Sequence, residues 1–116
     1  MIKTHVTVDF YGADAEIFET TALLERAINK ALLSLGLSPR QDSYIQFEPV
    51  GVTAIVVADN FHFGIHTWPE NKSCTIDLYS VKDQIFTRNI AEALKQEFRA
   101  SEYDIKFFNR SSKNLS

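Results

Sequence analysis

The chain has 116 residues, of which 45% are apolar and 23% charged, and its formal net charge is −3. This length predicts one domain, expected over residues 1–110 and followed by a polar tail at 111–116. No block of Lys and Arg stands out, so we expect no nucleic-acid binding. No apolar run approaches the ~18 residues of a membrane span, so we expect no membrane partner. The single cysteine excludes an internal disulfide, and with no signal-peptide pattern at the start we expect a cytoplasmic protein.

A strand and a helix open the predicted fold. Residues 3–11 alternate apolar with polar side chains, and this period of two is typical of a strand. Apolar residues then recur at helical spacing over 20–35. Thr20 or Thr21 can cap the start of this helix, and Gly36 stands where it should end.

Four strands follow in quick succession, predicted at residues 43–49, 52–59, 62–68 and 74–80. A second helix is predicted within 81–98, where Ser80 and Asp83 resemble a capping box, and a last strand at 103–109. The order β-α-β-β-β-β-α-β predicts an α+β fold. We expect a two-layer sandwich in which two helices cover one face of a mostly antiparallel sheet.

His62 and His66 lie four residues apart in a predicted strand, so both belong to one face, with Gly64 between them. They can be ligands or proton-transfer groups beside an open patch at Gly64, or two ordinary strand histidines satisfied by hydrogen bonds. A zinc site needs more ligands, and no cysteine or acidic cluster has suitable spacing. We therefore expect no metal.

Trp68, Pro69 and Glu70 end this strand. Proline removes a ladder donor and leaves Glu70 at a rim. The flat face of Trp68 and the charge of Glu70 can form the edge of a small-molecule site, or the tryptophan can pack in the core beside a solvated glutamate. Cys74 lies in a strand, where a small buried apolar side chain is expected rather than a reactive thiol.

The segment GVTAIVVADNFHFGIHTWPE at 51–70, followed by CTIDLYS, resembles the core of the prokaryotic S-adenosylmethionine decarboxylases. In that family a glycine-valine-serine turn and a valine run precede Glu-Ser-His, Ile-His-Thr-Trp-Pro-Glu and a later Thr-Cys-Gly. The resemblance also covers the opening strand and first helix. It implies an enzyme of spermidine biosynthesis that forms dimers with active sites near the subunit interface. It also implies an internal serine that cleaves the chain and becomes a pyruvoyl cofactor.

The sequence departs from this family at the reacting residues. The family's Glu-Ser pair falls on Asn60-Phe61, and its proton-donating cysteine falls on Val81. Phe61 has no oxygen or sulfur with which to form a pyruvoyl group, and Val81 cannot donate a proton. The resemblance therefore implies a member with no pyruvoyl cofactor and no intact catalytic set.

Other positions match the family. His66 matches the processing histidine, His62 the histidine after the serine, and Thr53 a hydroxyl-bearing position near the cleavage site. Phe47 and Glu70 match positions that flank the adenine. Stacking on a purine is a physical role for Phe47, and a phenylalanine at the edge of the core is the alternative.

Three functions remain open. The chain can be a binding or regulatory pseudoenzyme that pairs with itself or with an active relative and holds an S-adenosylmethionine-like ligand. It can instead be an enzyme of different chemistry, in which His62, His66 and Glu70 supply acid–base groups, but nothing in the sequence supplies an electron sink. It can also be a divergent decarboxylase with residual activity. In each case we expect the ligand to contact Phe47, His62, His66, Trp68 and Glu70.

Overall fold

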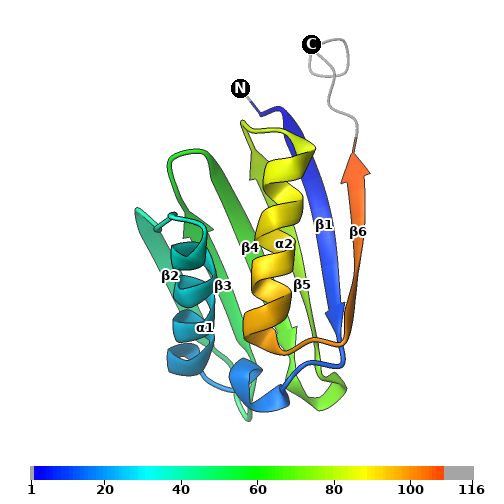
Figure 1. The fold of residues 1–116 in the computed structure, drawn as a ribbon. Helices are drawn as coiled ribbons and strands as arrows, with labels where there is room; N and C mark the ends of the chain where they lie inside the picture. Colours follow the sequence, from blue (N-terminus) through cyan, green and yellow to red (C-terminus); the bar gives the residue numbers. More distant parts are fainter. Residues whose placement is uncertain (1, 109–116) are drawn as a thin grey trace.

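The computed structural model describes residues 2–108, which form a six-stranded sheet with both helices on one face (Figure 1). The strand order is β2-β3-β4-β5-β1-β6, and every neighbouring pair is antiparallel. The predicted two-layer α+β sandwich is confirmed, and within the described residues the sheet is wholly rather than mostly antiparallel. The tail predicted at 111–116 lies outside them.

The elements are β1 (Thr4–Tyr11), η1 (Ala15–Phe18), α1 (Thr21–Ser34), β2 (Gln41–Gln46), β3 (Val52–Val57), β4 (Phe61–Trp68), η2 (Pro69–Asn71), β5 (Ser73–Ser80), α2 (Gln84–Phe98) and β6 (Glu102–Phe108). The short 3-10 helices η1 and η2 are absent from the sequence prediction. Among the described helices none is long and apolar enough to span a membrane.

Several predicted boundaries are wrong by one to three residues, and the last residue of the strand predicted at 103–109 lies outside the described residues. The strand predicted at 43–49 begins at Gln41 and ends before Pro49, which has no backbone N–H to donate to a neighbouring strand. The second helix begins at Gln84 because Asp83, not Ser80, caps it: the Asp83 side chain accepts from the Phe86 N–H at 3.0 Å.

The ends of α1 follow the sequence closely. The Thr20 hydroxyl accepts from the Leu23 N–H at 3.3 Å, which makes Thr20 the N-cap. Gly36 has a φ of 72°, and its N–H donates to the Leu33 carbonyl while that of Leu37 donates to Leu32, both at 2.9 Å. This left-handed position satisfies the last carbonyls of the helix.

The core fills the space between the sheet and the two helices. Alternate residues of β1, β3, β4 and β5 point toward α1 and α2 and are buried. The intervening residues lie on the opposite side of the sheet, which no helix covers within residues 2–108 and which is referred to below as the open face (Figure 1).

Three hollows formed by the described residues occur on or beside this open face. One, of about 480 Å³, lies over β2 and β3 and is lined by Gln41, Asp42, Ser43, Ile55 and Val57. The other two are smaller and contain the predicted ligand-binding residues.

Candidate functional site

The aromatic hollow lies beside the loop between β2 and β3 and has a volume of about 250 Å³. Phe47, Thr53, His66, Trp68 and Glu70 are among its lining residues. Phe47 is 50% exposed and Trp68 43% exposed, so neither packs in the core. The structure thus brings together four of the five predicted ligand-binding residues, and it decides against the core alternatives for both aromatic side chains.

Gln46 fixes the loop that carries Phe47. Its side-chain amide Nε2 donates to the carbonyls of Glu19 at 2.7 Å and Gly51 at 3.1 Å. Its Oε1 accepts from the Thr21 N–H at 3.1 Å. One side chain therefore ties the end of β2 to the start of α1 and to the loop before β3.

The glycine hollow lies over Gly64 on the open face and has a volume of about 270 Å³. His62, Asp77 and Tyr79 stand around it. A Cβ at Gly64 would approach nothing closer than the Ala54 carbonyl oxygen, at 3.8 Å. The missing side chain of Gly64 therefore leaves room for a ligand above the strand.

Thr53 and His66 line both hollows and join them. The Thr53 hydroxyl and Nδ1 of His66 lie 3.1 Å apart and form a hydrogen bond. Each hollow alone is smaller than the ~300–1,000 Å³ of most small-molecule sites, but together they reach that range. An extended ligand can therefore occupy both.

His62 and His66 do not act on the same atom. Both are exposed on the open face, as their spacing predicts. Four residues of strand separate their Cα atoms by ~13 Å, which is too far for one metal ion or a direct proton transfer. Among residues 2–108 no group of three or more His, Cys, Asp or Glu side chains could hold a metal ion.

A row of four stacked rings crosses the open face, and sequence reasoning missed it. His62, Tyr79, His5 and Phe108 stack in that order, with centroid distances of 5.0, 4.1 and 4.8 Å. Asp77 lies beside the row, with Oδ1 2.8 Å from Nε2 of His5 and Oδ2 accepting from the Tyr79 hydroxyl at 3.4 Å. The alternation in each strand assigns these side chains to one face, but only strand pairing makes them neighbours.

Phe61 lies outside both hollows. It is 4% exposed and faces the helices, where its ring centroid is 6.2 Å from that of Phe63 and 5.8 Å from that of Phe86 on α2. The phenylalanine at the position matched to the family's serine is therefore a core residue. It does not line the surface where the ligand-binding residues gather.

Asn60 and Val81 meet through their backbones. The Asn60 carbonyl accepts from the Val81 N–H at 2.9 Å and from the Ser80 hydroxyl at 3.2 Å. These hydrogen bonds hold the turn between β3 and β4 against the end of β5. Two of the positions at which the sequence departs from the family pattern are thus neighbours, and neither side chain lines the aromatic or the glycine hollow.

Cys74 is a buried residue on the helix side of β5, as expected, and is 1% exposed. Burial raises the pKa of its thiol well above the ordinary value of 9.0, and the nearby Asp9 carboxylate adds to the rise. The thiol is therefore protonated near neutral pH and unsuited to nucleophilic attack.

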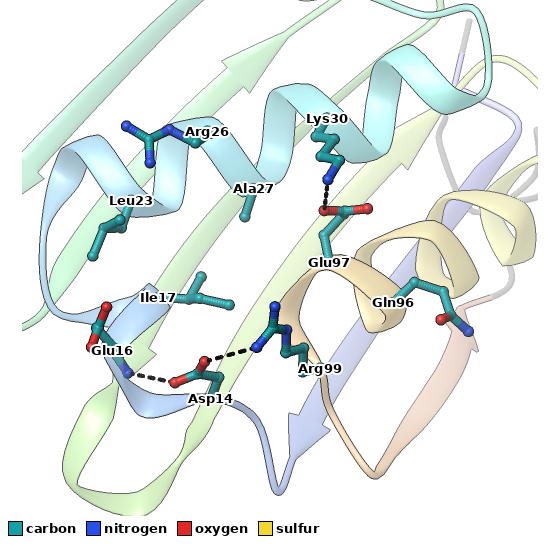
Figure 2. A pocket seen from close by; sticks show the side chains of 10 residues that line it. All are labelled: Asp14, Glu16, Ile17, Leu23, Arg26, Ala27, Lys30, Gln96, Glu97 and Arg99. Carbon is teal, nitrogen blue, oxygen red and sulfur yellow. Dashed lines mark hydrogen bonds and ion pairs between the residues drawn. The ribbon is translucent and has the colours of Figure 1, made fainter.

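Another cavity, of about 480 Å³, lies on the helix side between η1, α1 and the end of α2 (Figure 2). Two ion pairs stand in it: Lys30 with Glu97 at 3.9 Å and Arg99 with Asp14 at 3.8 Å. These charges neutralise one another. None of the predicted ligand-binding residues lines this cavity.

The S-adenosylmethionine decarboxylase family model matches residues 4–111. An S-adenosylmethionine decarboxylase proenzyme of Prochlorococcus marinus is 30% identical over 112 residues, which cover 97% of this chain and 90% of the relative. One from Thermoplasma volcanium is 32% identical over 98 residues, covering 84% of this chain and 75% of the relative.

The fold is also shared with a solved structure. The crystal structure of the adenosylmethionine decarboxylase from Aquifex aeolicus aligns with a TM-score of 0.80 and 26% identity, covering 92% of this chain and 88% of that chain. Fold and sequence agree over nearly the whole length. The chain therefore belongs to the S-adenosylmethionine decarboxylase family.

Proposed function

We propose that this family member binds an S-adenosylmethionine-like ligand as a pseudoenzyme related to polyamine biosynthesis, with a regulatory rather than a catalytic role. The observation that carries the proposal is the contrast between two aromatic positions. Trp68 remains exposed in the aromatic hollow beside Glu70, whereas Phe61 is buried in the core. The binding surface is thus present without a nucleophile at residue 61.

Calorimetric titration with S-adenosylmethionine tests this function. We expect a micromolar dissociation constant, and Trp68→Ala should weaken binding about tenfold by removing a stacking surface. Tyr11→Ala is the matched control, because Tyr11 is an exposed aromatic residue of β1 outside both hollows. No detectable heat at millimolar ligand would remove the proposal.

The pseudoenzyme proposal also requires an uncut chain without a pyruvoyl cofactor. Phe61 supplies no hydroxyl or thiol to attack the Asn60 carbonyl, so we expect one polypeptide of full mass after long incubation. Intact-mass spectrometry checks this directly. Two fragments that meet at residues 60 and 61 would contradict it.

We further propose that the protein is cytoplasmic and that its open face pairs with a second copy or with an active relative. Apolar side chains are exposed there from four strands: Ile45, Ile55, Val57, Trp68 and Phe108. Exposed apolar groups gathered on one face are typical of an interaction surface. A partner on this face would enclose the hollows at the interface.

An enzyme of different chemistry is the second candidate. The observation in its favour is that His66, hydrogen-bonded to Thr53, and Glu70 line the same hollow and could move a proton. Mass spectrometry of S-adenosylmethionine after incubation with the protein distinguishes the candidates. An unchanged ligand removes both this chemistry and residual decarboxylation, whereas loss of carbon dioxide supports a divergent decarboxylase.

A further inference from the structure

Acidic and aromatic groups line the two hollows, and among the described residues no lysine or arginine does. Glu70 lies in the aromatic hollow and Asp77 in the glycine hollow. Within residues 2–108 the basic side chains of the lining are His62 and His66. A ligand that spans the joined hollows therefore meets a carboxylate in each.

Asp77 can accept a further hydrogen bond. One oxygen contacts Nε2 of His5 at 2.8 Å, and the other accepts from the Tyr79 hydroxyl at the longer distance of 3.4 Å. An ionised carboxylate has about four acceptor positions, so these two contacts leave others available. The Asp77 side chain is 50% exposed, which lets an ammonium group reach it.

The rest of the glycine hollow suits the alkyl chain of a ligand. The rings of His62 and Tyr79 stack 5.0 Å apart at one side of it. The bare backbone at Gly64 allows an alkyl chain to lie close to the strand.

A ligand carboxylate would be disfavoured in the same place. It would lie near the charge of Asp77, and no lysine or arginine among residues 2–108 lines the hollow to pair with it. Like charges in a partly desolvated hollow repel. S-adenosylmethionine carries both an ammonium and a carboxylate at the end of its methionine chain. Loss of the carboxylate leaves an aminopropyl sulfonium, whose two charged groups, the ammonium and the sulfonium, are both positive.

We infer that the joined hollows select a cationic amine without a carboxylate, so that the protein binds the decarboxylated form of S-adenosylmethionine in preference to S-adenosylmethionine itself. This rests on the proposed ligand-binding function and specifies its ligand. The adenosine part would occupy the aromatic hollow and the amine the glycine hollow.

Titration of the intact protein with both ligands tests the preference. We expect the decarboxylated ligand to bind about tenfold more tightly, and Asp77→Asn to reduce that ratio to about twofold. Asp104→Asn removes a carboxylate of the open face on β6 that lines neither hollow, and should keep the ratio. Equal affinities, or tighter binding of S-adenosylmethionine, would overturn the inference.

Gly64→Val provides a steric test that spares the fold. The position lies within a strand, where valine is favoured, and its Cβ would meet only the Ala54 carbonyl oxygen, at an ordinary contact distance of 3.8 Å. We expect an unchanged melting temperature and at least tenfold weaker binding of the decarboxylated ligand. Unchanged binding in a folded variant would place the amine elsewhere and contradict the inference.

If neither adenosine ligand binds, the proposed function fails and the cation site is tested separately with 1,4-diaminobutane. Amide NMR signals of Gly64 and Asp77 should shift in the wild type and stay fixed in Asp77→Asn. Such shifts would support a cation site that has no adenosine subsite. Their absence would remove the cation site as well.

Discussion

At the scale of single residues, Phe61 is a core residue at the position that the family resemblance aligns with a reactive serine. Phe61 fills space beneath α2 against Phe86. Restoring a hydroxyl there therefore removes core packing as well as adding chemistry. The stability of Phe61→Ser therefore has to be measured before any effect of this variant on activity is interpreted.

Phe61→Ser should lower the free energy of unfolding by about 3–5 kcal/mol, because it removes a buried ring and buries a hydroxyl. Urea denaturation followed by circular dichroism measures the change. Ile85→Ser is the control on α2: Ile85 is 69% exposed, so its replacement should stay within about 0.5 kcal/mol. Equal effects of the two variants would mean that Phe61 is not part of the core.

Cys74 should make stability depend on alkaline pH. Its folded-state pKa is raised above the ordinary value of 9.0, so the unfolded chain loses the thiol proton first as the pH rises. The free energy of unfolding is therefore unaffected by this thiol below about pH 9.0, and above that pH it falls by up to ~1.4 kcal/mol per pH unit. Unfolding free energies measured on both sides of this pH check the decline. Cys74→Val should flatten it, and an identical decline in that variant would assign the effect to other groups.

At the scale of elements, β2 and the loop after it depend on side-chain hydrogen bonds more than on burial. Along β2 only Tyr44 is even partly buried. Gln46 compensates by bonding to backbone groups of two separate segments, one around the start of α1 and one before β3. The position of Phe47, and with it one wall of the aromatic hollow, therefore depends on its neighbour in the sequence.

Gln46→Ala should weaken S-adenosylmethionine binding by about fivefold and lower the unfolding free energy by ~1–2 kcal/mol, because backbone groups lose their partners and the loop loosens. Titration and urea denaturation measure the two effects. Gln41→Ala, at the other end of β2, is the control, since no hydrogen bond of its side chain occurs among the described residues. Wild-type affinity in Gln46→Ala would show that Phe47 needs no such support.

At the scale of the whole molecule, the open face combines apolar side chains with an acidic excess. On β5, β1 and β6 the strand registers assign to this face four carboxylates and one lysine: Asp77, Asp9, Glu102, Asp104 and Lys106. Two copies that meet through this face bring like charges together. A partner with a basic face would instead gain attraction.

Sedimentation velocity at two salt concentrations separates these kinds of pairing. If the protein self-associates through the open face, raising the salt from ~0.05 M to ~0.5 M should strengthen the dimer by screening repulsion. Ile45→Lys on the open face should shift it to monomer, whereas Leu33→Lys on α1, where Leu33 is 72% exposed, should not. If the protein is a monomer at all concentrations, it does not pair with a second copy, and the proposed partner is a different chain.

The sequence by itself determined the elements and the family. Local periodicity specified the strands and helices, because the face on which a side chain lies follows from two residues per strand repeat and 3.6 per helical turn. The motif around Ile65–Glu70 carried the family, and the absence of a nucleophile at Phe61 is a property of the sequence. The sequence did not determine where α2 begins, because Ser80 and Asp83 can both cap a helix.

Only the tertiary structure decided which side chains meet. It placed Phe61 under α2, stacked the rings of His62, Tyr79, His5 and Phe108 across the open face, and brought His5 into contact with Asp77, 72 residues away, at 2.8 Å. Within a strand the sequence sets only the face, whereas lateral neighbours depend on strand order and register. Those are set by the packing of the whole sheet against its helices, so no local pattern could reveal the two hollows or their charge.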